Sequence, residues 1–200
     1  SKGSILSCTS PSTGSSTATT VGATHGSRAN INSGGAAQSI QVLGGGSINL
    51  TGGTAGQRNF ANISAQTGTQ TISGAAAINL TGGAAGGVAG EGNGAYINSE
   101  VGNQSISAGA ISLAGGGAGI ENLAQIRQGS ASNGLGATQT ITVSGSGALS
   151  LDGGAGTTNL ARIQAFGTTQ TITMGAGAAL DLTGGTGASN NFARIQAVNG

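Results

Sequence analysis

The 200-residue sequence predicts an all-β fold: a right-handed parallel β-helix, or β-solenoid, with about three strands in each coil of about 32 residues. Three observations lead to this prediction. Glycine accounts for 42 residues, while charged residues make up 6% and aromatic residues 2%. Gly, Thr, Ser and Asn, which dominate the chain, are weak helix formers. Short phrases also recur at regular spacing, and each alternates apolar and polar residues like a strand with one buried face.

The first strand predicted in each coil ends in isoleucine and recurs six times, for example as FANI at 60–63 and LARI at 160–163. Successive copies lie roughly 29–37 residues apart, a spacing typical of repeat architectures. Because side chains alternate between the two faces of a strand, these isoleucines are expected to share the buried face. They are Ile31, Ile63, Ile97, Ile126, Ile163 and Ile195.

A second strand follows with the pattern Gln-Ser/Thr-Ile, and a third with patterns such as INL at 48–50 and LDL at 180–182. Each third strand leads into a glycine-rich turn, which places a corner before the next coil. Parallel strands are joined by right-handed crossovers in nearly all known cases, and this rule sets the expected handedness. The second strand adds the core residues Ile40, Ile72, Ile106, Ile141 and Ile172.

These phrases define five full coils and the start of a sixth, which together form one β-solenoid domain over residues 27–200. Residues 1–26 lie outside the pattern and are rich in Ser and Thr, so they are predicted to be a tail or linker. In the fourth coil, the segment QGSASNGLGAT at 128–138 is longer than its counterparts and predicts a surface loop.

Two sets of amide side chains recur in register and are interpreted as structural ladders. Asparagine tolerates a left-handed backbone and can form hydrogen bonds along a stack of identical residues. The alternative for the asparagines is a row of ordinary loop residues, and for the glutamines a column facing solvent. The two sets are Asn59, Asn93, Asn122, Asn159 and Asn191, and Gln38, Gln70, Gln104, Gln139 and Gln170.

Units such as QTITVSGSGALSLDGGAGTTNLARIQA at 139–165 resemble the β-helical repeats of large secreted bacterial adhesins. The resemblance is to filamentous-haemagglutinin-like proteins, the exported partners of two-partner secretion systems, and it covers residues 27–200. It implies a right-handed parallel β-helix that is secreted or held at a bacterial cell surface, where it forms a fibre or stalk.

The sequence shows no grouping of residues typical of catalysis, of a metal site or of a cofactor site. The five acidic residues are scattered over several coils, whereas acid–base hydrolysis takes two carboxylates close together. His25 is the sole histidine, so no Cys/His cluster indicates zinc. A net charge of +1 with dispersed arginines argues against nucleic-acid binding. No apolar run reaches the roughly 20 residues of a transmembrane helix.

Two outward faces are candidate contact surfaces. The first carries threonine rows like those of ice-binding solenoids, although threonine is also a common exposed strand residue. These threonines are Thr138, Thr140, Thr142, Thr169, Thr171 and Thr173. The second face is polar and is suited to a carbohydrate or a neighbouring subunit, the alternative being an ordinary solvated face. It carries Asn30, Asn62, Tyr96, Gln125, Arg162 and Arg194.

The sequence therefore predicts a non-enzymatic, extracellular structural or adhesive module of a bacterial surface or secreted fibre. Its expected partners are other copies of itself and a surface glycan or cell receptor. One alternative is a self-assembling filament subunit joined end to end through open coil ends. A further alternative is an ice-binding protein that uses the threonine rows.

Overall fold

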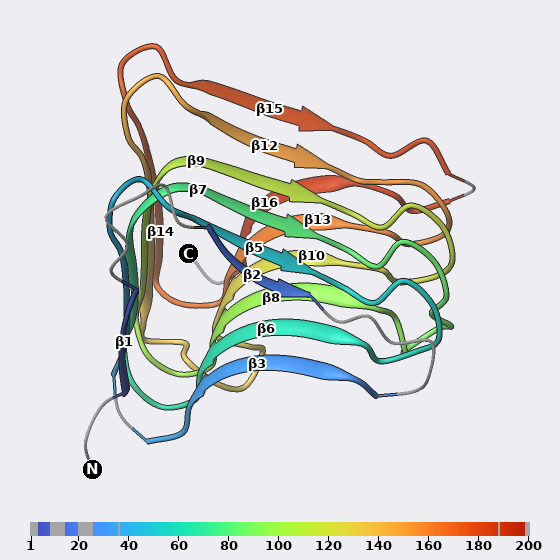
Figure 1. Cartoon of the computed structure of the whole chain (residues 1–200), viewed down its shortest axis with the longest axis horizontal. Coiled ribbons are helices and arrows are strands. Elements are labelled where there is room, and N and C mark those ends of the chain that lie inside the picture. Colours follow the sequence, from blue (N-terminus) through green and yellow to red (C-terminus); the bar gives the residue numbers. More distant parts are fainter. Residues whose placement is uncertain (1–3, 9–14, 20–25, 36, 188, 199–200) are drawn as a thin grey trace.

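A computed structural model of the chain describes residues 4–8, 15–19, 26–35, 37–187 and 189–198. Every regular element in these residues is a β-strand, and neighbouring strands are parallel. The strands wind into stacked coils of about 32 residues, forming a β-solenoid of about 5 turns (Figure 1). The predicted all-β parallel solenoid is therefore confirmed.

The first strands of successive coils form a six-stranded sheet, here called sheet B. Their pairing is in exact register, so that each isoleucine lies beside the isoleucine of the next coil, as Ile126 does beside Ile163. From bottom to top in Figure 1, sheet B contains β3 (Arg28–Ser33), β6 (Phe60–Ala65), β8 (Gly94–Ser99), β10 (Ala124–Gln128), β13 (Ala161–Ala165) and β16 (Ala193–Ala197).

The second and third strands of the coils belong to a ten-stranded sheet, here called sheet A. The second strands lie in β4 (Gln38–Val42), β7 (Gln70–Thr81), β9 (Gln104–Ala114), β11 (Thr138–Val143) and β14 (Thr169–Met174). The third strands lie in β5 (Ser47–Thr51), the later parts of β7 and β9, β12 (Ala148–Asp152) and β15 (Ala179–Thr183). In β7 and β9 the chain turns the corner without leaving the sheet. Gly74 in β7 has a φ of 78°, and a Cβ on Gly109 in β9 would lie 2.5 Å from Ala76 O, so both positions favour glycine.

Two strands come from the segment that the sequence analysis assigned to a tail. β1 (Ser4–Cys8) pairs in parallel with β4, and β2 (Ser15–Thr19) pairs in parallel with β5. The structure thus continues both ladders of sheet A into residues before 27. Backbone hydrogen bonds between parallel strands need no particular side chain, so this pairing does not depend on the repeat phrases.

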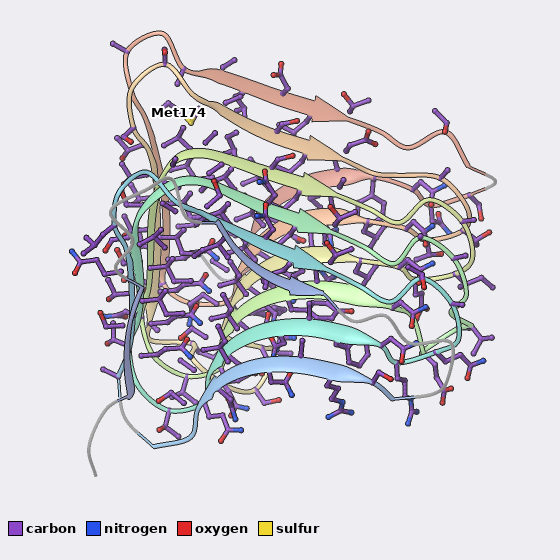
Figure 2. The ribbon with its side chains drawn as sticks, viewed as in Figure 1. Met174 is labelled. Carbon is purple, nitrogen blue, oxygen red and sulfur yellow. The ribbon has the colours of Figure 1, made fainter. Side chains whose placement is uncertain are left out.

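The core is a set of stacked Ile, Leu, Val and Ala side chains enclosed by the two sheets (Figure 2). Both predicted isoleucine columns lie in it, and their members in the middle coils are fully buried, as are Ile141 and Ile163. Ile31, Ile172 and Ile195, in the outermost coils, are half-buried and pack against the core. Met174, labelled in Figure 2, packs in the same way at the last coil.

The last described coil is the least buried part of the solenoid. Leu180 and Leu182 on β15 are 54% and 45% exposed, whereas Leu149 and Leu151 below them on β12 are 0% and 1% exposed. The difference arises because no described coil lies above β15.

Candidate functional site

The predicted asparagines lie in one column at the corner that leads into sheet B, and four of the five are fully buried. From Asn93 onward, each Oδ1 accepts a hydrogen bond from the backbone N–H of the asparagine one coil earlier, and Asn59 Oδ1 accepts one from the backbone N–H of Ser27. Asn122 Oδ1, for example, lies 2.8 Å from Asn93 N. The same bond recurs at 3.0 Å from Asn59 to Asn93, at 2.8 Å from Asn122 to Asn159 and at 2.8 Å from Asn159 to Asn191.

The asparagine side chains also stabilise the glycine-rich turns. Asn59 Nδ2 donates to Ala55 O at 2.6 Å, and Asn93 Nδ2 donates to Ala85 O at 2.9 Å. The left-handed backbone that was expected at the asparagines lies instead at the residue before the asparagine, in four of the five coils of the column. These residues are Arg58, Glu121, Thr158 and Asn190, with φ of 56°, 56°, 57° and 54°. The asparagine is used for its side-chain amide, because a buried backbone N–H needs an acceptor.

The predicted glutamines form a second column, on the inward face of β4, β7, β9, β11 and β14. From Gln70 onward, each Nε2 donates to the Oε1 of the glutamine one coil earlier, as Gln104 does to Gln70 at 2.8 Å. Gln38 Nε2 donates to a backbone carbonyl, Ser64 O, at 3.1 Å. The other distances in the column are 2.8 Å from Gln70 to Gln38, 2.7 Å from Gln139 to Gln104 and 2.8 Å from Gln170 to Gln139. Nε2 also reaches backbone carbonyls of sheet B, so the amides join the two sheets; Gln104 Nε2, for instance, lies 3.1 Å from Arg127 O.

The threonine rows lie on the outer face of sheet A, in two adjacent coils. Thr138, Thr140 and Thr142 on β11 pair with Thr169, Thr171 and Thr173 on β14, respectively. In the coil before them, Ser105 and Ser107 take the places of Thr140 and Thr142. The threonine array is thus two coils high, and serine hydroxyls extend it.

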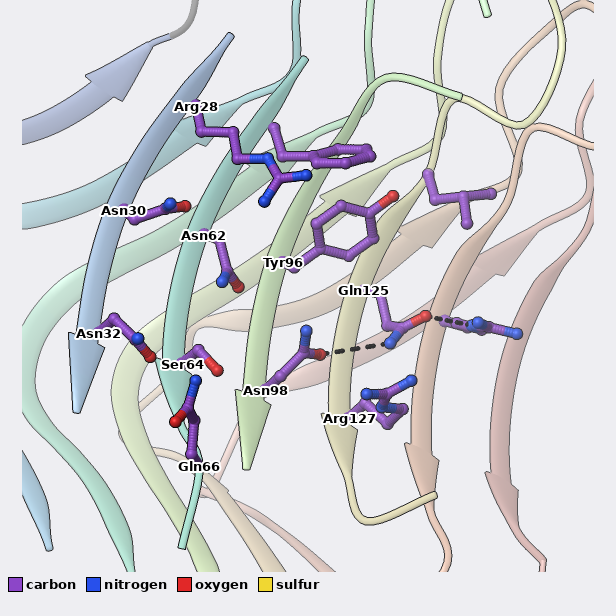
Figure 3. A pocket seen from close by; sticks show the side chains of 13 residues that line it. Arg28, Asn30, Asn32, Asn62, Ser64, Gln66, Tyr96, Asn98, Gln125 and Arg127 are labelled. Atoms are coloured by element: carbon purple, nitrogen blue, oxygen red, sulfur yellow. Dashed lines mark hydrogen bonds between the residues drawn. The ribbon is translucent and has the colours of Figure 1, made fainter. Parts of the chain in front are cut away.

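A groove of about 520 Å³ crosses the outer face of sheet B, from β3 to β13 (Figure 3). Its volume is within the range of small-molecule sites. The register of the strands arranges its lining in three columns that run along the solenoid axis. The lining contains Arg28, Phe60 and Leu123 in the first column, Asn30, Asn62, Tyr96, Gln125 and Arg162 in the second, and Asn32, Ser64, Asn98 and Arg127 in the third, with Gln66 at the edge.

Two aromatic rings lie together in this groove. The rings of Phe60 and Tyr96 meet edge to face, with centroids 5.4 Å apart and planes at 69°. The Tyr96 ring occupies the space above Gly94, where a Cβ would collide with it, so glycine at 94 determines where the ring lies. Burial raises the pKa of Tyr96 to about 12. Its phenol is therefore protonated at neutral pH and can donate a hydrogen bond.

A chain of hydrogen bonds crosses the floor of the groove from β8 to β13. Gln125 Nε2 donates to Asn98 Oδ1 at 3.3 Å, and Arg162 Nε donates to Gln125 Oε1 at 2.6 Å, as the dashed lines in Figure 3 show. Arg127 forms a bidentate ion pair with Glu100, with its Nη2 2.8 and 2.9 Å from the two carboxylate oxygens. These bonds hold the amides and guanidinium groups in fixed orientations.

Two polar atoms of the groove residues have no hydrogen-bond partner among the described residues. They are Asn62 Oδ1, an acceptor, and Arg127 Nε, a donor. Buried polar atoms without a partner are rare in native proteins and call for an explanation such as a bound ligand or water. In the part of the chain that the structure describes, no acidic side chain lines the groove, and no cluster of three or more His, Cys, Asp or Glu residues is present.

The second column of the groove was predicted from the sequence, whereas the first and the third columns were not. The structure brings Tyr96 and Arg162 into this groove, while Arg194 lies beyond it on β16, with its guanidinium 4.9 Å from the Phe192 ring centroid. The signal for the third column was present, because Asn32 and Asn98 follow Asn30 and Tyr96 by two residues. The position of Gly94 under the Tyr96 ring has no signal in the sequence.

Comparison with known proteins yields no match: no protein-family model, no curated protein and no solved structure aligns significantly with the chain. Within the described residues there is no helix whose length and apolar character would let it cross a bilayer.

Proposed function

We propose that this chain is an extracellular adhesive module of a bacterial surface or secreted fibre, and that it binds a glycan without chemical turnover. The observation that carries this proposal is the groove on sheet B, where two aromatic rings lie beside two columns of amides. Aromatic rings offer an apolar surface to a sugar ring, and a few fixed polar groups determine the orientation of a ligand. The placement at a bacterial surface is supported by the resemblance of the repeats to secreted adhesins.

The chemistry of the lining supports binding in preference to hydrolysis. Its polar groups are amides, hydroxyls and guanidinium groups, whereas most glycoside hydrolases act with a pair of carboxylates that flank the bond. Amides donate and accept, so that they suit the hydroxyl groups of a sugar, which also do both. Adhesion by a repetitive fibre needs modest affinity at each site, because many weak contacts add up to strong attachment.

The solenoid itself supplies a rigid support for this groove. The lining comes from five neighbouring strands, each held in register by backbone hydrogen bonds and fixed at both ends by an amide column. A site on such strands changes little when it binds, so that little free energy is lost in ordering it. The proposed role of the fold is thus to present the groove in a fixed shape.

Replacing Tyr96 with alanine is expected to weaken glycan binding by about 10-fold or more, because the aromatic ring proposed to contact the sugar is removed. Tyr96→Phe keeps the ring and is expected to retain most of the affinity. Binding of the purified chain to a glycan array, followed by calorimetry with the best ligand, measures both effects. Circular dichroism of each variant shows whether the fold is intact.

Thr140→Ala is the matched control, since Thr140 lies on the outer face of the other sheet. It is expected to leave glycan binding unchanged. The proposal is overturned if the wild-type chain binds no glycan on the array, or if Tyr96→Ala binds as tightly as the wild type.

A further inference from the structure

The end of the groove nearest β13 carries two arginines on adjacent strands, Arg127 on β10 and Arg162 on β13. They differ in their partners. Arg127 is neutralised by Glu100, whereas Arg162 has no carboxylate partner among the described residues. Its Nε is held by Gln125, and neither of its Nη atoms has a hydrogen-bond acceptor in the part of the chain that the structure describes.

The surroundings of Arg162 also disfavour an unpaired positive charge. Burial lowers the pKa of Arg162, and the nearby charges of Arg127 and Arg194 lower it further. The guanidinium nevertheless remains protonated, because the ordinary pKa of arginine is far above neutral. An anion placed at its Nη atoms would relieve both the lost hydration and the repulsion between the arginines.

We propose that the groove binds an acidic glycan, with the carboxylate of a uronic acid residue on the Nη atoms of Arg162 and an adjoining sugar ring against Tyr96. This inference rests on the proposed function and names the ligand class of the same groove. Arginine presents a planar pair of N–H donors that matches a carboxylate. With Nε fixed by Gln125, the direction of the free donors is set before the ligand arrives.

The rest of the groove matches the neutral part of such a chain. Asn30 and Asn32 line the groove with amide groups, which can both donate hydrogen bonds to and accept them from the hydroxyls of a sugar. Arg28 lines the opposite end, but it is exposed and lies 5.8 Å from the Phe60 ring centroid, so its charge is more strongly screened by solvent. The two ends of the groove therefore differ: both carry an arginine without a carboxylate partner among the residues that the structure describes, but Arg162 is less hydrated than Arg28.

The test is calorimetry of the whole chain with uronic acid oligosaccharides, namely oligogalacturonate, alginate and hyaluronan fragments. Each is paired with its carboxyl-reduced counterpart, in which the charge is removed and the ring retained. At least one acidic oligosaccharide is expected to bind, and its neutral counterpart is expected to bind about 10-fold more weakly. Arg162→Gln is expected to weaken binding of the acidic form by about 10-fold and to abolish most of the preference for the acidic over the neutral form.

Arg58→Gln is the matched control. It removes the same charge from the chain, but Arg58 lies at a corner outside the groove and is paired with Glu91 at 2.6 Å. Arg58→Gln is expected to change neither the affinity for the acidic oligosaccharide nor the affinity for its neutral counterpart. Polyglutamate serves as a probe for charge alone and is expected to bind far more weakly than the acidic sugar.

Each contrary result has a separate meaning. If the acidic and neutral forms bind equally, or if Arg162→Gln has no effect, the proposal of an acidic ligand is overturned while the proposal of glycan binding stands. If polyglutamate binds as tightly as the acidic sugar, the proposal of an acidic glycan is also overturned, because charge alone would then account for binding. If no glycan of either form binds, both the acidic ligand and the proposed function fail.

Discussion

Replacing Asn122 with alanine is expected to lower the free energy of unfolding by about 2–6 kcal/mol, because each buried polar group left without a partner costs about 1–3 kcal/mol. Asn122 is fully buried, and its Oδ1 is the acceptor for the backbone N–H of Asn93. Its Nδ2 donates to Ala118 O in the adjoining turn. Alanine would leave both backbone groups unpaired in the interior. Urea unfolding followed by circular dichroism measures the change.

Asn103→Ala is the control, because it makes the same substitution at an exposed position. Asn103 Oδ1 also accepts a backbone N–H from a neighbouring coil, that of Thr138 at 2.9 Å, but Asn103 is exposed and water can replace it. This variant is expected to cost less than about 1 kcal/mol. Equal losses in the two variants would contradict the role assigned to burial.

Replacing Gln104 with leucine is expected to cost about 2–4 kcal/mol, although leucine is similar in size and apolar, because the amide's partners remain buried. Gln104 stands in the middle of its column, with Nε2 2.8 Å from Gln70 Oε1 and Oε1 2.7 Å from Gln139 Nε2. Leucine leaves Gln70 Oε1 without its donor and breaks the column in two. The midpoint of urea unfolding is expected to fall accordingly.

Two further variants separate the column from a general effect of leucine. Gln41→Leu changes an exposed glutamine that faces outward on β4 and is expected to cost less than about 0.5 kcal/mol. Gln70→Leu combined with Gln104→Leu is expected to cost less than the sum of the single changes, because the second change removes an amide that the first left unpaired. Additive costs would show that the two amides do not depend on each other.

The repeat pattern was sufficient to predict the coils, since stacking requires the same kind of residue at the same position in every coil. The isoleucines of β6 and β11 are examples: each lies in a strand whose alternation is visible in the sequence. The pairing of β1 and β2 was not predicted, because backbone hydrogen bonds hold those strands and their residues lack the repeat phrases. The second and third strands of one coil are continuous in β7, where the register with β9 shifts between Ile72 and Ala75, and alternation does not reveal such a shift.

The candidate site was predicted in part. Tyr96 and Arg162 were assigned to one outward face because they occupy the same place in their repeats. The depth of the groove was not predictable, since it depends on the Tyr96 ring lying over Gly94 and on the edge-to-face contact with Phe60. The difference between Arg127 and Arg162 arises from Glu100, which lies 27 residues before Arg127 in the chain and beside it in space.

The two amide columns fix each coil at two points, and the chain between those points varies in length. Gln70 follows Asn59 by eleven positions, whereas Gln139 follows Asn122 by seventeen, yet both glutamines join the same column. The additional residues leave the stack at the corner over 129–137. The entropy cost of closing a loop rises slowly with its length. This corner is thus a position where foreign peptide sequence can be grafted while the coils on either side keep their alignment.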